Sequence, residues 1–117
     1  MSDLNLKAIV NDIASAHNAL AKATMSLYDA QYAHLRATAD YNLKVAKAVA
    51  LGEITGSSDN KINIAARDKF SVEYLARKGT EGNLILATRD LEMAKVEIAR
   101  MRMLAALGAE ALAFDIE

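Results

Sequence analysis

Two histidines, His17 and His34, are the side chains best suited to general acid–base chemistry or to metal binding. They lie 17 residues apart within one predicted helix. Neither has a second ligand at the i,i+4 or His-Glu-x-x-His spacing that directs two side chains onto one metal ion. We therefore expect surface or interface histidines and predict no metal site.

The carboxylates and hydroxyls are also poorly spaced for catalysis. Glu92 and Glu97 are five residues apart, so they do not share a helix face, and no Glu-x-x-His pair accompanies them as in di-iron bundles. No serine lies in the Gly-x-Ser-x-Gly turn that exposes the nucleophile of many hydrolases. We expect no catalytic residue and no cofactor, and we predict that the protein is not an enzyme.

Basic side chains gather in the middle of the chain, where they could contact nucleic acid or another phosphate. The acidic neighbours Asp59, Asp68 and Glu73 nearly neutralise them, which favours a solvated helix face. The sequence from Gly79 to Gly82 has the Gly-x-x-Gly spacing that clamps nucleic-acid backbones beside a strand, but no strand is predicted here. The basic cluster consists of Lys61, Arg67, Lys69, Arg77 and Lys78.

The composition favours long helices in a single domain. Of 117 residues, 53% are apolar but only 5% are aromatic, and no proline interrupts a helix. The formal net charge of −1 gives no general attraction to nucleic acid, an anionic membrane or an acidic substrate. The sequence shows no cysteine, no secretory signal and no apolar run of membrane-spanning length, so we expect a cytoplasmic protein without membrane contact.

Apolar residues recur every seven positions in both halves of the chain, which is the spacing of a helix-packing seam. Small residues, mostly alanine, follow each row three positions later and would let two helix backbones approach closely. These rows predict an all-α, coiled-coil-like antiparallel hairpin in which residue i opposes about residue 114 − i. The seam consists of Leu6, Ile13, Leu20 and Leu27 in the first half, and of Leu84, Leu91, Ile98, Ala105 and Leu112 in the second.

The first helix is expected over residues 3–51 of a single hairpin domain spanning residues 1–117. No glycine or proline interrupts this stretch, and Asp3 places a negative charge at its start, which suits the helix dipole. Gly52 is placed to end the helix in the left-handed conformation. A long continuous first helix is therefore predicted.

The second arm is expected to be helical over residues 60–113, after a bend at residues 52–60. Ser58 or Asp59 is suited to cap its first turn. Two glycines within four residues predict a kink or a break at 79–82. A real break would leave a three-helix arrangement open.

A second apolar row lies outside the seam of the predicted second arm. Leu86, Met93 and Leu107 are offset from the seam by two positions, with Val96 and Met103 nearby. Exposed apolar rows on long helices usually mark another packing surface. We therefore predict that the chain forms a homo-oligomer, a dimer or a larger assembly, through this row.

Several short motifs follow one another in a characteristic order. An alanine-rich helix precedes the Gly-Glu-Ile-Thr-Gly-Ser-Ser-Asp-Asn-Lys bend and then Ala65-Ala66-Arg67, and the last helix contains Leu91-Glu92-Met93-Ala94-Lys95-Val96-Glu97 and Met101-Arg102-Met103-Leu104. Over roughly residues 30–107 this order resembles small helical-hairpin proteins of tailed bacteriophages. The chain departs from that family at Ser57-Ser58-Asp59 and at its two later glycines. The resemblance implies a phage accessory protein made inside the bacterial host, with no site residue to carry over.

The leading functional hypothesis is a non-enzymatic phage accessory protein that oligomerises and binds a macromolecule, such as a host defence or replication factor. A second hypothesis is a recombination accessory that binds nucleic acid through the basic cluster and loses affinity steeply with salt. A third is a protein that sequesters a small nucleotide-like ligand near the bend, where basic and hydroxyl side chains lie beside glycines.

Overall fold

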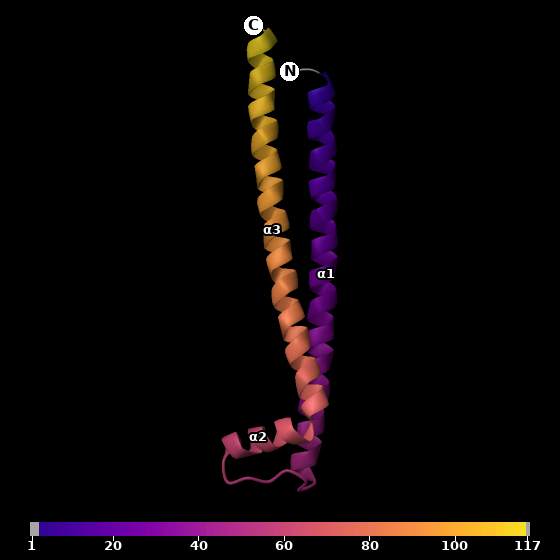
Figure 1. The fold of residues 1–117 in the computed structure, drawn as a ribbon, viewed down its shortest axis with the longest axis vertical. Coiled ribbons are helices and arrows are strands. Elements are labelled where there is room, and N and C mark those ends of the chain that lie inside the picture. Colours follow the sequence, from indigo (N-terminus) through magenta and orange to yellow (C-terminus); the bar gives the residue numbers. More distant parts are fainter. Residues whose placement is uncertain (1–2, 117) are drawn as a thin grey trace. The chain divides into compact units, whose positions relative to one another are not determined.

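Three α-helices make up the described part of the chain, and no strand occurs between residues 3 and 116 (Figure 1). The computed structural model describes the backbone of residues 3–116 and the side chains of residues 6–108. The helices are α1 (Asp3–Ala50), α2 (Asp59–Lys69) and α3 (Ser71–Ile116). The predicted all-α helical hairpin is therefore confirmed.

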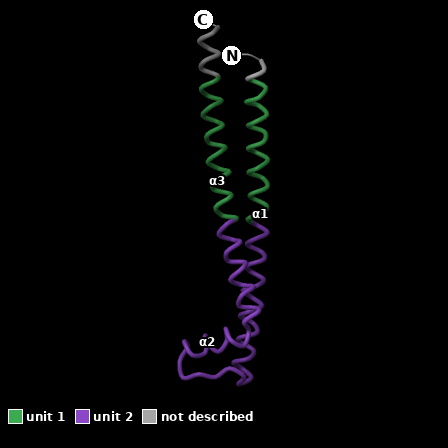
Figure 2. The backbone as a smooth tube through the Cα atoms, viewed as in Figure 1, with its two compact units in different colours: residues 1–27, 87–117 green, residues 28–86 purple. Residues whose placement is uncertain are grey.

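The chain divides into two compact units, each of which contains a part of α1 and a part of α3 (Figure 2). Unit 1 consists of residues 1–27 and 87–117, and unit 2 of residues 28–86. Within each unit the two helix segments run antiparallel. Among the described residues, no helix is both long enough and apolar enough to cross a membrane.

The core of unit 1 is built on a small residue. Ala16 of α1 is buried against Ile98 and Met101 of α3, and Ile13 and Leu20 pack beside this contact. Because alanine ends at Cβ, the two backbones can approach while the larger side chains of α3 fill the space above and below it. The alternation of leucine or isoleucine with alanine in the sequence therefore corresponds to real packing in this unit.

The core of unit 2 joins all three helices and the bend. Tyr41 and Ala48 of α1, Ile54 of the bend and Ala66 of α2 are buried together. Phe70, which lies between α2 and α3, packs against this cluster from one side. Figure 1 shows α2 lying across the end of the α1–α3 pair, so these contacts fasten the bend to both long helices.

The end of α1 is a Schellman motif centred on Gly52, as the sequence predicted. Gly52 has a φ of +73°, a left-handed conformation that glycine adopts without steric penalty. Its N–H donates to the carbonyl of Val49 at 3.1 Å, and the N–H of Glu53 donates to the carbonyl of Ala48 at 2.8 Å. Ile54 then turns into the core of unit 2.

Ser58 caps the start of α2, in agreement with one of the two expected caps. Its backbone is extended, with φ −149° and ψ 159°, and its Oγ accepts a hydrogen bond from the N–H of Lys61 at 3.3 Å. Asp59 then stands in the first turn, where its negative charge suits the helix dipole.

The break in the second arm occurs at Phe70. Of the kink or break predicted at 79–82, the break is wrong, because α3 is continuous there. Phe70 has φ −111° and ψ 46°, outside the helical region; its N–H donates to the carbonyl of Ala66, and its own carbonyl accepts from the N–H of Tyr74. One residue thus ends α2 and begins α3. Helix α3 continues through Gly79 and Gly82, so their helix-propensity cost of about 2 kcal/mol relative to alanine is not enough to break it.

Candidate binding surfaces

The predicted seam residues line the interior of both units, with one exception at the end of the row. Leu91 and Ile98 are buried in unit 1, and Ala105 is half-buried there. Leu6 is 45% exposed. The side chain of Leu112 lies outside the described residues. Half-buried positions are held by Ile13, Leu20 and Leu27 on α1 and by Leu84 on α3.

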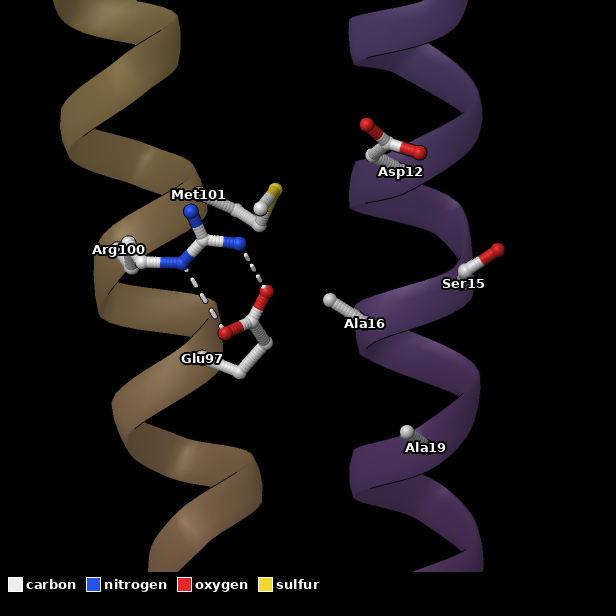
Figure 3. A pocket seen from close by; sticks show the side chains of 7 residues that line it. All are labelled: Asp12, Ser15, Ala16, Ala19, Glu97, Arg100 and Met101. Atoms are coloured by element: carbon white, nitrogen blue, oxygen red, sulfur yellow. Dashed lines mark hydrogen bonds and ion pairs between the residues drawn. The ribbon is translucent and has the colours of Figure 1, made fainter.

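A shallow polar groove runs between α1 and α3 in unit 1 (Figure 3). Its polar part is an ion pair on α3, in which Arg100 donates to Glu97 through Nη2 at 2.7 Å and through Nε at 3.1 Å. These hydrogen bonds hold the pKa of Glu97 below its ordinary value and raise that of Arg100. The lining residues are Asp12, Ser15, Ala16, Ala19, Glu97, Arg100 and Met101.

The arrangement in this groove does not provide a nucleophile with a base. Figure 3 shows the Ser15 hydroxyl on α1 well separated from the carboxylate of Glu97, whose two oxygens both face Arg100. The Arg100 guanidinium in turn is already held by a carboxylate, so an added anion would have to displace Glu97. The groove therefore has the character of a solvated helix junction.

The predicted oligomer row lies in water. Met93 and Leu107 of α3 are 59% and 56% exposed in unit 1, and Leu86 is 55% exposed in unit 2. Val96 and Met103 are exposed beside the two unit 1 residues, and we call Met93, Val96, Met103 and Leu107 the methionine face. Arg89, Glu92 and Glu97 border its first part, where they line an open groove together with Met93 and Val96.

Another exposed apolar surface lies on α1 in unit 2. Its side chains are between 62% and 70% exposed, more than those of the methionine face on average. They lie at intervals of four, three and eight residues, which places them on one side of the helix, and we call them the tyrosine face: Tyr28, Tyr32, Leu35 and Leu43. Arg36 lies over the Tyr32 ring, 5.8 Å from its centroid, and supplies a positive edge to this surface.

Three of the five predicted basic residues converge on a single aromatic ring in unit 2. The guanidinium carbons of Arg67 and Arg77 lie 5.2 and 5.4 Å from the Tyr74 centroid, and the Lys78 Nζ lies 5.9 Å from it. Arg77 also lies 4.8 Å from the centroid of Tyr41. Between residues 6 and 108, neither Arg67 nor Arg77 forms an ion pair, so their N–H donors are directed at rings and solvent.

The other two predicted basic residues do not join this cluster. Lys69 forms an ion pair with Glu53 at 3.3 Å, which ties the end of α2 to the bend. Lys61 is exposed in the first turn of α2. Lys78 contributes to the cluster but also pairs with Glu81 at 3.3 Å, so part of its charge is balanced. Of the five predicted basic residues, the structure therefore brings Arg67, Arg77 and Lys78 together around Tyr74.

An interhelical ion pair that the sequence did not reveal lies close to this cluster. Lys44 of α1 donates to Glu73 of α3 at 3.0 Å and lies 3.5 Å from Asp40. The hydrogen bond holds the pKa of Glu73 below its ordinary value and raises that of Lys44. The pair fixes α1 against α3 one turn from the Tyr41–Tyr74 contact, whose ring centroids are 5.8 Å apart.

The two histidines lie in different environments. His17 is exposed in unit 1, whereas His34 is half-buried in unit 2 and lies with its Nδ1 3.0 Å from the Thr80 Oγ1. Within the described range, no three histidine, aspartate or glutamate side chains lie close enough to hold a metal ion. One turn from His34, the Thr38 hydroxyl is buried without a hydrogen-bond partner.

Comparisons with protein-family models, with curated proteins and with solved structures find no match for this chain. The similarity to phage helical-hairpin proteins therefore stays a prediction.

Proposed function

We propose that this protein is a non-enzymatic, self-associating helical protein that acts by binding a macromolecule through its exposed apolar faces. The observation that carries the proposal is the imbalance between its buried and exposed apolar side chains. Among the described residues, nine hydrophobic side chains are buried and four of these are alanines, whereas nineteen large hydrophobic side chains are exposed. Solvation of so many large apolar side chains is unfavourable, and association would remove them from water.

Charged substitutions on the two exposed faces test the proposal. Met93→Asp and Leu35→Asp place a carboxylate on the methionine face and on the tyrosine face, where the native side chains lie in water. We expect both variants to keep their helical circular dichroism, and at least one to have a lower mass than the wild type by light scattering. If both single variants and the double variant have the same mass in solution as the wild type, the proposal is contradicted.

Leu91→Asp is the control for folding, because Leu91 is buried in the seam of unit 1. A buried unpaired charge is expected to cost several kcal/mol, of the order of 3, or to force the carboxylate to take up a proton. Loss of helical signal in Leu91→Asp but not in Met93→Asp would separate the seam from the outer face. If Leu91→Asp and Met93→Asp have the same melting temperature, the inner face is assigned wrongly.

The biological setting in the proposal is that of a phage accessory protein in a bacterial cell, and it rests on the short motifs near the bend. We expect the partner to be a host or phage protein, such as a defence or replication factor. Capture from infected lysate by the wild type, compared with capture by Leu35→Asp and Met93→Asp, tests this part. A partner retained equally by all three proteins would not use these faces.

A second candidate function is binding of a nucleic acid or another phosphate at the Tyr74 cluster. The convergence of three cations from α2 and α3 on one ring favours it, because aromatic contacts orient guanidinium groups while leaving N–H donors available. Single-stranded DNA should bind with an affinity that falls steeply with salt, and Arg67→Gln with Arg77→Gln should abolish it. Calorimetry with cyclic and linear nucleotides separates a small-ligand site from a nucleic-acid site.

A further inference from the structure

Two guanidinium groups of unit 2 meet on one aromatic ring although they come from different helices. Arg67 lies in the last turn of α2 and Arg77 lies near the start of α3, and the break at Phe70 brings both against Tyr74. We call Arg67 and Arg77 the arginine pair. Lys78 lies against the same ring. Positive charges gathered in this way repel one another, so the cluster favours the approach of an anion.

The carboxylates nearest to the arginine pair on α3 are held by other side chains. Glu73 accepts a hydrogen bond from Lys44 at 3.0 Å, and Glu81 pairs with Lys78 at 3.3 Å. The exposed Asp68 of α2 forms no ion pair within residues 6–108. Over the same residues, neither guanidinium of the arginine pair forms an ion pair or donates a hydrogen bond. Their donors are therefore free for a ligand.

Aromatic contacts hold the Arg77 side chain in place without a carboxylate. Its guanidinium carbon lies 4.8 Å from the centroid of Tyr41 and 5.4 Å from that of Tyr74, and the residue is half-buried. A guanidinium packed on rings keeps its N–H edge available, because the contact uses its face. It also has less side-chain freedom left to lose when a ligand binds. Arg77 is thus an oriented donor.

We propose that the arginine pair binds a phosphate group that carries two negative charges, as at the end of a phosphate monoester. This inference rests on the second candidate function above and narrows its ligand. A carboxylate has two oxygens, which the fork of one guanidinium satisfies. A phosphate monoester has three acceptor oxygens and a charge of about −1.5 to −2 at neutral pH, so it can accept from two guanidiniums at once.

The surroundings favour a compact ligand over a nucleic-acid strand. Strand binding uses open aromatic faces for base stacking and a continuous basic track for the backbone. Here Tyr41 is buried, and Tyr74 is half-buried with three cations against it. Glu73 and Glu81 lie before and after Arg77 on α3, so they interrupt a basic track and repel further phosphates. A compact monoester presents its charge to the arginine pair alone.

Titration of the wild-type chain with phosphate compounds at constant ionic strength tests the proposal. The arginine Nε–H resonances in ¹H–¹⁵N spectra should shift for Arg67 and Arg77, and not for Arg36, with inorganic phosphate and with adenosine 5′-monophosphate. Tighter binding of the nucleotide would assign the ligand to organic monoesters, and equal binding would assign it to the phosphate group alone. Adenosine should not bind, and cyclic adenosine monophosphate, a singly charged diester, should bind at least about tenfold more weakly. Equal shifts with adenosine would overturn the proposal.

Arg77→Gln should weaken binding of adenosine 5′-monophosphate by about tenfold or more in calorimetry, because charge-assisted hydrogen bonds are lost. Arg77→Lys keeps the charge but not the fork, so it should restore only part of the affinity. Arg36→Gln is the matched control, since Arg36 lies over the single ring of Tyr32, 5.8 Å from its centroid. This variant should bind like the wild type. Equal weakening by Arg36→Gln would show a general charge attraction and overturn the proposal.

Single-stranded DNA with hydroxyl ends separates this inference from the function on which it rests. If the DNA shifts the arginine pair resonances and the monoesters do not, the inference is wrong while the second candidate function stands. If neither ligand shifts them, both are wrong. Self-association through the apolar faces is measured separately and does not depend on either result.

Discussion

The Nδ1 atom of His34 and the Oγ1 atom of Thr80 lie 3.0 Å apart and join α1 to α3 within unit 2. The two residue numbers add up to 114, which is the register expected from the leucine and alanine rows. The Thr80 hydroxyl also donates to the carbonyl of Arg77 at 2.8 Å. A hydroxyl has a single hydrogen, so Thr80 accepts from His34, and the Nδ1 of His34 must be the donor.

The neutral His34 ring is therefore expected to carry its hydrogen on Nδ1. Nitrogen chemical shifts of the imidazole, measured by long-range ¹H–¹⁵N correlation, report which nitrogen is protonated. Thr80→Val removes the acceptor, and we expect a loss of about 1 kcal/mol of stability together with a shift toward the Nε2–H form. An Nε2–H ring in the wild type would contradict the hydrogen-bond network.

Thr38→Val should stabilise the protein, which is unusual for a core substitution. The Thr38 hydroxyl is buried without a partner, so its removal abolishes a desolvation penalty of about 1 kcal/mol or more. Thr24→Val is the matched control. The Thr24 hydroxyl donates to the carbonyl of Leu20 at 2.8 Å, so the loss of this hydrogen bond should lower the free energy of unfolding. Urea denaturation at equal protein concentrations compares the two. Destabilisation by Thr38→Val would mean that this hydroxyl has a partner.

The ion pair between Lys44 and Glu73 should make stability depend on pH. Its hydrogen bond lowers the pKa of Glu73 from the ordinary value of 4.5 and raises that of Lys44 from 10.5. The contribution of Glu73 to folding stability is fully present above pH 4.5 and is lost as the pH falls through its lowered pKa. The contribution of Lys44 is fully present below pH 10.5 and is lost as the pH rises through its raised pKa.

Glu73→Gln should therefore melt at a lower temperature than the wild type at neutral pH and at nearly the same temperature in strong acid. Glu92→Gln is the comparison, since Glu92 pairs with Lys95 within one turn of α3 and holds no other helix. A Glu73→Gln deficit that persists unchanged in strong acid would show that the charge of Glu73 does not contribute through this pair.

Ala66→Leu should disrupt the junction of α2 with the long helices. Ala66 is 0% exposed and lies in the cluster with Tyr41, Ala48 and Ile54, so added methylenes have no free space. We expect a loss of about 1–3 kcal/mol from overpacking. Ala33→Leu, at an exposed position of α1, should change stability by less than about 0.5 kcal/mol in the same denaturation experiment. If Ala66→Leu has the same stability as the wild type, α2 is not closely packed against the long helices.

The features of the fold that could be predicted from sequence are those that local chemistry determines. Gly52 ends α1 and Ser58 begins α2 because each supplies a backbone or side-chain property that a helix terminus needs. The break at Phe70 could not be predicted, since phenylalanine has ordinary helix propensity and the break depends on packing against the bend. The low helix propensity of Gly79 and Gly82 opposes helix formation, but its cost of about 2 kcal/mol is too small to break α3.

The binding surfaces were predicted less completely than the fold. The exposed row with Met93 could be read from periodicity, because a helix with two apolar sides must turn one of them outward. The convergence of Arg67 and Arg77 on Tyr74 could not, because it depends on how α2 crosses α3 after the break at Phe70. A sequence pattern places residues on one helix, but it does not place two helices joined by an unpredicted turn.

Sedimentation equilibrium of the untagged wild-type chain over a wide concentration range tests the central claim most directly. Self-association through the exposed apolar faces predicts a mass of twice 12.6 kDa or a higher multiple, with dissociation on dilution. A mass of 12.6 kDa at every concentration would contradict it.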